Sequence, residues 1–403
     1  MKLSTASSST PQYSKNHGSN LTIAHDSILE DQEQEYPSIS QELYEYLSTT
    51  AEMAKIAYCT VNPFFSVGEL KDECEPMRFC RETENTRIVG VFRPNWWSGS
   101  ISGTVAVVVK EDTKEVFVNY RGTCAPGDWV TDFNALQSKY MPVMAPGDGT
   151  GVSKAMRDVV NEYNGFVGLH AGNGTEVETA RFGKLLADKV SEKLEALGQG
   201  DICAKCKVHM GVYLAHAHIF PKVFQGVKPF VEQGYKLTVT GHSLGGGFAQ
   251  LAGAEFQYLG YMPRTVSYGQ LRVGNPGTNE WTDMLFHTRQ LANKLKGQHV
   301  PPYGSFTRVY QTTDLVPLLP PFKKYTHAGM AIAIEQITLP QDKGVVEFRG
   351  ASNNWKNEGI ELDDYRGDWR ALFVLYQHLN YFTRLSWPCN DAELFAPEDA
   401  WVW

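Results

Sequence analysis

Apolar residues near the start of the chain recur at helical spacing and predict an amphipathic helix from Ser38 onward. Ile39, Leu43, Leu47 and Ala57 fall on one side of such a helix, because an α-helix turns once in about 3.6 residues. An apolar stripe of this kind faces a core. We therefore expect the folded part of the chain to begin here.

Two β-branched runs follow, at 104–109 and 115–120, and the polar segment 110–114 separates them. Two strands joined by a short polar connection are typical of a β-hairpin. The two runs therefore predict a hairpin.

Strands and helices then alternate along the chain. Strands are predicted at 235–240, 265–268 and 306–310, with a helical pattern after the first of them and another at about 276–295. Such alternation favours an α/β fold with a mainly parallel central sheet flanked by helices.

The stretch 137–202 interrupts this alternation. It contains the Gly- and Pro-rich segment 145–151 and helical patterns at 153–164 and 178–197. We interpret it as an insertion in the α/β domain and not as a domain of its own.

The first 37 residues differ from the rest of the chain. They are rich in Ser and Thr and then acidic, a composition that buries too little apolar area to become ordered. We predict a disordered polar tail at 1–37 and a single domain at 38–403.

The charge balance excludes one class of partner. The chain has 37 Lys and Arg against 45 Asp and Glu, a formal charge of −8, whereas a nucleic-acid reader needs a basic face. No run reaches the roughly 18 apolar residues of a membrane-spanning helix. We expect neither a nucleic-acid partner nor a transmembrane segment.

The first candidate chemistry lies in the motif Gly241-His-Ser-Leu-Gly245, directly after a β-branched run and before a helical pattern. This strand-turn-helix setting is that of a nucleophile elbow. The two glycines carry no Cβ where strand and helix crowd together, so Ser243 can adopt unusual torsions and present its hydroxyl. The alternative is a Gly-rich turn with an incidental serine.

A serine nucleophile needs a base and an orienting acid. In this fold the acid follows the serine and the histidine comes last. Asp314 follows the strand predicted at 306–310, where an acid belongs, and His378 lies near the C-terminus. From spacing alone, His327 competes closely with His378 as the base.

The oxyanion of the reaction needs two hydrogen-bond donors. The backbone N–H of Leu244, which follows the nucleophile, is one candidate. The other is expected in the loop 120–124, after an earlier strand. The alternative for that loop is a Gly turn that closes the hairpin.

Several motifs, taken in order, resemble those of the class 3 lipase family, in particular the secreted lipases of filamentous fungi and yeasts. The resemblance covers about residues 38–390. The motifs are Ala57-Tyr-Cys59, Tyr120-Arg-Gly-Thr123 with Asp128-Trp-Val-Thr-Asp132, 201–211, Val239-Thr-Gly-His-Ser-Leu-Gly-Gly246, 268–275, Asp314-Leu-Val-Pro317 with Tyr325-Thr-His327, and His378-Leu-Asn-Tyr-Phe382.

The resemblance implies an α/β-hydrolase fold and a Ser-His-Asp triad of Ser243, His378 and Asp314. It also implies that Thr123 is the second oxyanion residue and that Asp132 steadies its hydroxyl.

Three other histidines match residues of the family that have a structural role. They are His209, His242 and His327.

The seven cysteines fit the same resemblance. It implies the three disulfides Cys59–Cys389, Cys74–Cys80 and Cys203–Cys206 and leaves Cys124 unpaired. Disulfides form in oxidising compartments, so we expect a secreted protein, although no signal peptide is visible in the sequence.

Family members cover their site with a short lid, and the matching segment here is about 124–136. Trp129 and Phe133 stand one helical turn apart in it, an apolar pair that could rest on lipid when the lid opens. The alternative is an ordinary helix packed on the core. The insertion at 137–202 could enlarge the lid, shape an acyl tunnel or decorate the surface.

The sequence thus predicts a serine-dependent carboxylester hydrolase, most simply a triacylglycerol lipase acting at an oil-water interface through an acyl-enzyme. The alternative is an esterase or phospholipase for monoacylglycerols, phospholipids or feruloyl esters. Neither a cofactor nor a metal is implied. The Cys203-x-x-Cys206 pair alone could be half of a zinc site, but no second pair completes it.

Overall fold

The computed structural model describes most of the chain. The described residues are 36–60, 67–69, 85–93, 104–122, 136–144, 184–192 without 186 and 190, 202–320, 323–351 and 374–386. Residues 1–35 of the tail predicted at 1–37 lie outside them, as do Thr123, the expected lid residues 124–135, most of the insertion, and the cysteines 74, 80, 124 and 389.

Helices and strands alternate through the described part of the chain. The helices are α1 (Gln41–Cys59), α6 (Met210–Glu232), α7 (Leu244–Tyr258), α8 (Pro276–Leu285), α9 (Thr288–Leu295) and α10 (Val374–Leu379), with short 3-10 turns at Val316–Leu318 and Lys343–Val345. The strands are β1 (Gly68–Glu69), β2 (Thr86–Phe92), β3 (Val105–Lys110), β4 (Glu115–Tyr120), β5 (Gln137–Lys139), β6 (Lys207–His209), β7 (Lys236–His242), β8 (Arg264–Tyr268), β9 (Ser305–Gln311), β10 (Met330–Ile334), β11 (Val346–Gly350), β12 (Asn380–Tyr381) and β13 (Thr383–Arg384).

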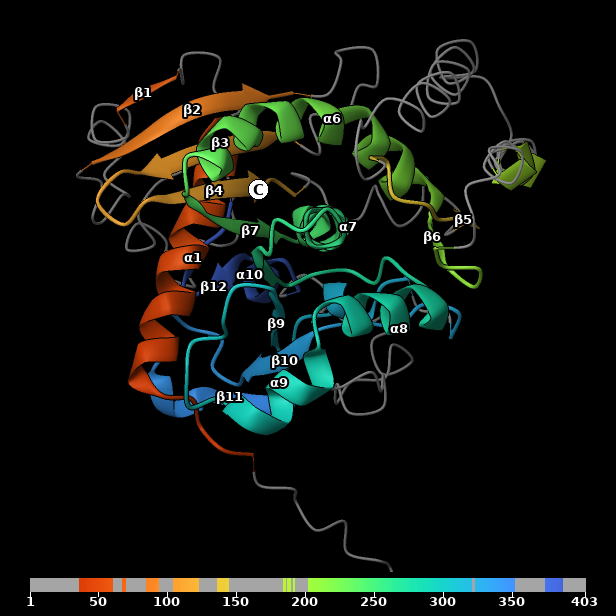
Figure 1. Ribbon diagram of the computed structural model, residues 1–403. Coiled ribbons are helices and arrows are strands. Elements are labelled where there is room, and N and C mark those ends of the chain that lie inside the picture. The colour runs from red at the N-terminus through yellow and green to blue at the C-terminus, as the bar shows by residue number, and fades with distance from the viewer. Residues whose placement is uncertain are drawn as a thin grey trace, which may run out of the picture. The chain divides into compact units, whose positions relative to one another are not determined.

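One large twisted sheet organises this part of the protein (Figure 1). Among the described residues its strands follow the order β1-β2-β3-β4-β7-β8-β9-β10-β11. Strands β4, β7, β8, β9 and β10 are parallel to their neighbours in that run, while β1, β2 and β3 at one end and β11 at the other are antiparallel. The prediction of a mainly parallel central sheet is confirmed.

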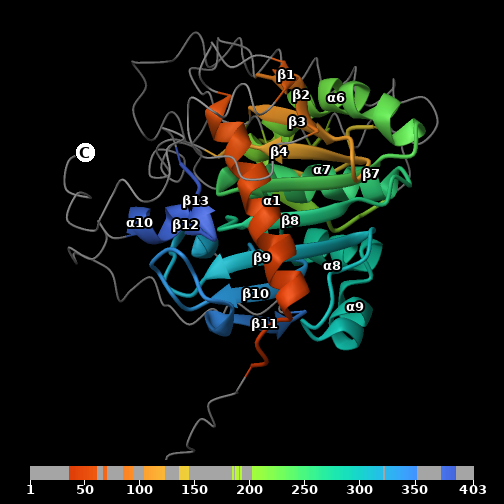
Figure 2. The same cartoon turned by 90° about the vertical axis from the view of Figure 1, so that its left-hand side faces the viewer.

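The sheet is buried on both faces, and alternate residues of each strand face opposite cores. Val105 and Val107 belong to a core shared with α6 and α7, whereas Ala106 and Val108 belong to a core shared with α1. Figure 2 shows α1 crossing the strands on the face towards the viewer. Helices α6 and α7 therefore cover one face of the sheet and α1 covers the other, and together they hold in place the strands that carry the candidate site.

Local sequence explains where α1 begins. The Ser40 hydroxyl accepts a hydrogen bond from the Leu43 backbone N–H at 3.2 Å, which caps the helix. Leu43, Leu47 and Ala57 are all buried, as their spacing predicts. The expected hairpin is also present, since β3 and β4 pair as antiparallel neighbours.

The first residues of the expected insertion are part of the main core. Strand β5 pairs with β6, and Tyr140 and Val143 are buried with the α6 and α7 core. The described residues of the later helical pattern at 178–197 are helical, with Ala187 buried and Leu185 54% exposed. The first residues of the expected insertion, 137–144, are therefore held in place by their pairing with β6 and by packing against the core of α6 and α7.

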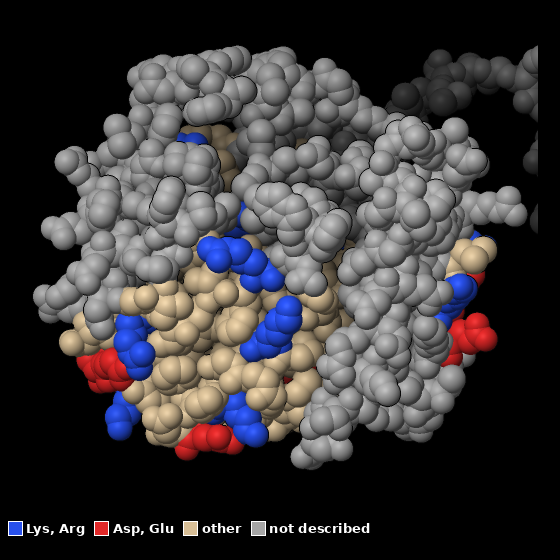
Figure 3. Space-filling view, turned by 90° about the horizontal axis from the view of Figure 1, so that it is seen from above, with Lys and Arg blue, Asp and Glu red and all other residues tan. Residues whose placement is uncertain are grey.

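No helix in the described ranges is both long and apolar enough to cross a membrane. On the face seen in Figure 3, the Lys and Arg residues that the structure describes are scattered among uncharged ones, with Asp and Glu beside some of them. Within that described surface the charges form no continuous band of one sign.

Candidate active site

The strand-turn-helix expected around Ser243 is present. Ser243 stands between β7 and α7 with φ of 61° and ψ of −127°, a conformation that L-residues adopt only under constraint. A Cβ on Gly241 would lie 2.2 Å from the Gly245 oxygen, and one on Gly245 would lie 2.2 Å from the Tyr120 oxygen. Both positions therefore require glycine, and the turn holds Ser243 at the carboxyl end of β7.

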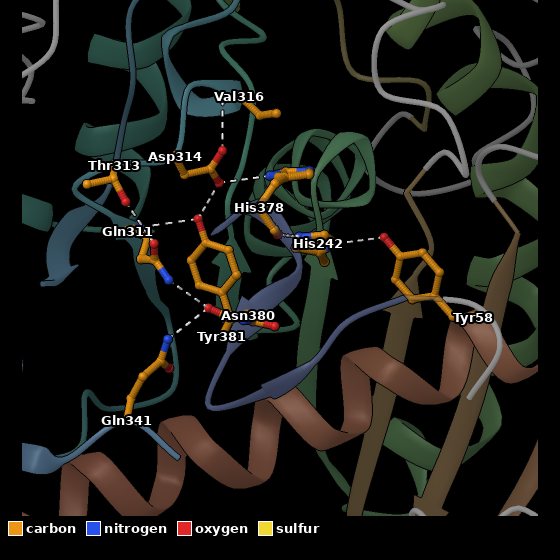
Figure 4. A network of polar contacts seen from close by, with 10 residues as sticks. All are labelled: Tyr58, His242, Gln311, Thr313, Asp314, Val316, Gln341, His378, Asn380 and Tyr381. Atoms are coloured by element: carbon orange, nitrogen blue, oxygen red, sulfur yellow. Dashed lines mark hydrogen bonds and ion pairs between the residues drawn. The ribbon is translucent and has the colours of Figure 1, made fainter. Parts of the chain in front are cut away.

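Asp314 follows the carboxyl end of β9, which lies two strands from β7 in the sheet, and is 2% exposed. Its Oδ1 accepts a hydrogen bond from the Val316 backbone N–H at 2.9 Å. Its Oδ2 accepts one from the Tyr381 hydroxyl at 2.5 Å and faces His378 Nδ1 at 2.8 Å. Both oxygens of the carboxylate are thus engaged (Figure 4).

His378 lies in α10 and is 1% exposed. Because its Nδ1 faces the Asp314 carboxylate, the proton of a neutral ring resides on Nδ1, and Nε2 keeps its lone pair. Among the described residues Nε2 has no hydrogen-bond partner, although it is buried. The ring can therefore accept a proton at Nε2 while Asp314 stabilises the resulting charge.

The structure brings His378 beside the nucleophile turn without hydrogen bonding its ring to Ser243. The link is His242, which directly precedes Ser243. Its Nε2 donates to the His378 carbonyl at 2.6 Å, and the two imidazole rings are 4.5 Å apart between centroids. Catalytic hydrogen bonds are often unmade in a free enzyme.

Tyr58 of α1 completes this side of the site. Its hydroxyl is 2.6 Å from His242 Nδ1. Burial and the neighbouring His378 hold the pKa of His242 well below its usual value, so His242 is neutral. The ring then accepts from Tyr58 at Nδ1 and donates to His378 at Nε2.

Of the two expected oxyanion residues, the structure describes Leu244. It is the first residue of α7, so its backbone N–H has no partner within the helix. Thr123 lies outside the described residues, but Gly122 before it does not. A Cβ on Gly122 would lie 2.9 Å from Ser243 Cβ and 2.6 Å from the Tyr58 hydroxyl, so this loop approaches the nucleophile.

The competing histidine, His327, is placed elsewhere. Its Nε2 is 2.7 Å from the Pro317 carbonyl oxygen. Burial and the nearby Arg308 and Arg272 hold the pKa of His327 well below its usual value. The acid Asp314 therefore faces His378 and not His327.

The sequence motifs contained two further site residues to which no role had been given. Tyr58 stands in the Ala-Tyr-Cys motif, and Tyr381 stands three residues after His378. Burial and the Asp314 carboxylate raise the pKa of Tyr381 well above its usual value, so its hydroxyl stays protonated and donates. The sequence signal for both tyrosines is that they lie within motifs that resemble those of the family.

Two of the cysteine expectations can be examined. Cys203 and Cys206 form a disulfide, as expected, and Cys59 is disulfide-bonded. The expected partner of Cys59 lies outside the described residues. Within those residues, no three His, Cys, Asp or Glu side chains are grouped so as to hold a metal ion.

A family model described as Lipase (class 3) matches residues 117–324, just over half of the chain. The Saccharomyces cerevisiae protein named "Putative lipase LIH1" is 26% identical over 85% of this chain and 94% of its own length. The secreted mono- and diacylglycerol lipase 2 of Gibberella zeae is 31% identical over 46% of this chain, about half (51%) of that relative.

Solved structures share the architecture. The Lip2 lipase of Yarrowia lipolytica superposes with a TM-score of 0.59 at 21% identity, covering 88% of this chain and 98% of its own. The mono- and diacylglycerol lipase of Aspergillus oryzae gives 0.53 at 18% identity, covering 86% and 98%. The expected α/β-hydrolase fold is thereby confirmed.

Proposed function

The chain belongs to the class 3 lipase family and is a lipase-type carboxylic ester hydrolase, and on that premise we propose that Ser243, His378 and Asp314 form its catalytic triad. The observation that carries the proposal is the His378 ring. It faces a buried carboxylate at 2.8 Å through Nδ1, and its buried Nε2 has no partner among the described residues. In this arrangement the lone pair of Nε2 can accept the proton of the Ser243 hydroxyl.

In the first half of the reaction, Ser243 Oγ attacks the ester carbonyl carbon while His378 Nε2 takes the hydroxyl proton. The carbonyl oxygen becomes an oxyanion, which the N–H groups of Leu244 and Thr123 stabilise. Each such donor lowers the barrier by about 3 kcal/mol. The carbon–oxygen bond to the alcohol then breaks, and His378 returns the proton to the leaving alcohol.

The second half hydrolyses the acyl-enzyme. Water attacks the same carbonyl carbon and gives its proton to His378 Nε2. The bond to Ser243 Oγ breaks, His378 protonates that oxygen, and the fatty acid leaves. Asp314 keeps its charge throughout and stabilises the imidazolium that forms twice in each cycle.

We propose acylglycerols as the substrates, with triacylglycerols first. Partial acylglycerols are the second candidate, because two relatives are named as secreted mono- and diacylglycerol lipases. The rates of hydrolysis of triolein, diolein, monoolein and a phosphatidylcholine, each measured separately under the same emulsion conditions, distinguish these candidates from the esterase or phospholipase alternative. Activity confined to the last two substrates would reject the triacylglycerol assignment.

The expected lid at 124–136, with Trp129 and Phe133, supports a second proposal, that the enzyme acts at an oil-water interface. The test compares one short-chain ester below and above its solubility limit. An abrupt rise above that limit is expected. A smooth saturation curve would instead indicate an esterase of dissolved substrates.

We also propose that the protein is secreted. Two relatives are named as secreted lipases, and the Cys203–Cys206 disulfide is typical of oxidising compartments. The fraction of the protein in culture medium against cells tests this directly.

The triad is tested with a fluorophosphonate probe, which reacts with activated serines. We expect mass spectrometry to find the label on Ser243 and no label in Ser243→Ala. His378→Ala should label at least 100-fold more slowly with its fold intact. Rapid labelling of folded His378→Ala would mean that another group is the base.

A further inference from the structure

The proposed triad is surrounded by a second set of buried polar contacts that starts on α1. The Tyr58 hydroxyl is 2.6 Å from His242 Nδ1, and His242 Nε2 is 2.6 Å from the His378 carbonyl oxygen. Tyr58, His242 and His378 are all at most 2% exposed. Figure 4 shows the three residues in line, with Tyr58 on the side away from Asp314.

The direction of the hydrogen bonds in this line is fixed by chemistry. A backbone carbonyl only accepts, so His242 Nε2 must carry the proton that bonds to the His378 oxygen. A neutral imidazole then has a lone pair on Nδ1, and the Tyr58 hydroxyl has to donate to it. The His378 carbonyl therefore selects the one tautomer of His242 that can hold the backbone of His378, and the Tyr58 hydroxyl stabilises that tautomer by donating to Nδ1.

The opposite tautomer would act against the site. With the proton on Nδ1, His242 would turn the lone pair of Nε2 towards the lone pairs of the His378 oxygen, at 2.6 Å. Such a contact is repulsive and would displace the last turn of α10. His378 Nδ1 would then lose its alignment with Asp314, from which it is now 2.8 Å away.

We propose that Tyr58 and His242 are positioning residues for the general base: Tyr58 stabilises the His242 tautomer with the proton on Nε2, and His242 holds the main chain of His378 against the nucleophile turn. This inference rests on the proposed triad. Neither residue touches the reacting atoms in the mechanism above, so both act through His378.

The Tyr58 hydroxyl also meets the loop expected to stabilise the oxyanion. A Cβ on Gly122 would lie 2.6 Å from that hydroxyl, 2.7 Å from the His242 carbonyl oxygen and 2.9 Å from Ser243 Cβ. The close fit places Tyr58 where the end of β4, the nucleophile turn and α10 come together. One residue of α1 thus supports three parts of the site that are distant in sequence.

Few ionisable groups face this line among the described residues. Asp314 contacts His378, and the Tyr381 ring is 5.7 Å from the His242 ring between centroids. Tyr381 stays protonated because burial and Asp314 raise its pKa.

The test uses Tyr58→Phe, His242→Gln and His242→Leu, with Tyr213→Phe as the matched control. Tyr213 is also fully buried, and its hydroxyl donates to a backbone oxygen, that of Met141, at 2.7 Å. It lies on α6, across the sheet from α1. The control therefore loses a comparable hydroxyl without touching His242.

The assay is turnover of p-nitrophenyl butyrate below its solubility limit, divided by the number of sites that a fluorophosphonate titrates, from pH 5 to 9. Tyr58→Phe should lose on the order of 10-fold in kcat per titrated site. The acid limb of its kcat/KM profile should move to lower pH, because a looser bond to Asp314 stabilises the His378 imidazolium less.

The two substitutions of His242 separate positioning from packing. A glutamine amide can place an N–H donor where His242 Nε2 stands, so His242→Gln should stay within about 10-fold of the parent. His242→Leu has no donor and should lose on the order of 100-fold or more. A merely structural role would lower the titrated fraction equally in both and leave kcat per site unchanged.

Each result decides between the two proposals. If Tyr58→Phe matches Tyr213→Phe in kcat per site and in its acid limb, the positioning role is wrong while the triad stands. If the parent shows no turnover that Ser243→Ala abolishes, the triad and the positioning role both fail.

Discussion

Replacing Asp314 by Asn tests the orienting acid, because its carboxylate accepts hydrogen bonds at both oxygens. Oδ1 accepts from the Val316 N–H at 2.9 Å, and Oδ2 receives His378 Nδ1 at 2.8 Å and the Tyr381 hydroxyl at 2.5 Å. An amide has one acceptor oxygen and one NH2 group, so it cannot reproduce this pattern.

In the orientation of the new Asn that keeps the bond from the Val316 N–H, the Tyr381 hydroxyl proton loses its acceptor. The Asn oxygen accepts from the Val316 N–H, and its NH2 group donates to both the His378 ring and the Tyr381 oxygen. His378 Nδ1 then has to be an acceptor, so its proton moves to Nε2. A triad histidine in this wrong tautomer costs about 10⁴-fold in kcat in serine proteases, and we expect a loss of about that size.

The measurement is kcat per folded molecule on a dissolved short-chain ester, with the thermal midpoint as the check on folding. Asp283→Asn is the matched control. Asp283 lies on α8 and is a buried acid that accepts a hydrogen bond from the Gly329 backbone N–H at 2.8 Å. The control variant should keep kcat within about threefold. Folded Asp314→Asn that retained a tenth of the parent kcat would refute the assignment of Asp314.

Three other outcomes are expected. His327→Ala should cost about 1–3 kcal/mol of unfolding free energy, from its lost bond to the Pro317 oxygen, but leave kcat per folded molecule nearly unchanged; an inactive folded protein would contradict this. Gly245→Ala should yield little active protein, because its Cβ would meet the Tyr120 oxygen at 2.2 Å; parent-like yield and activity would count against the tight turn. Burial lowers the pKa of His209 from 6.5 to about 4. Between these pH values the unfolded chain binds a proton at His209 and the folded chain does not, so the free energy of unfolding falls by up to about 3 kcal/mol as the pH drops from 6.5 towards 4. Denaturant titrations should show a smaller fall in His209→Gln, and equal falls would contradict the shift.

Local pattern predicted most of the fold near the site. The helix stripe of α1 and the hairpin of β3 and β4 are present because their apolar residues have strong helical and strand periods. Strands β10 and β11 were not predicted, although both lie in the main sheet. Each has only five residues, so neighbouring strands determine their pairing more than local preference does.

The site was predictable to different degrees. The Gly-x-Ser-x-Gly motif indicates Ser243 through local geometry. His378 and Asp314 are 64 residues apart, so their contact depends on how the whole sheet folds, and spacing alone left His327 in competition. The proposed role of Tyr58 depends on the packing of α1 against β7, which no local pattern contains.

The most direct test of the proposed triad is a crystal structure of the protein inactivated by an alkyl phosphonate. We expect the phosphorus to be bonded to Ser243 Oγ, with His378 Nε2 within hydrogen-bond distance of an adduct oxygen and the Leu244 N–H directed at the phosphoryl oxygen. An adduct on another residue, or on Ser243 with the His378 ring out of reach, would contradict the account.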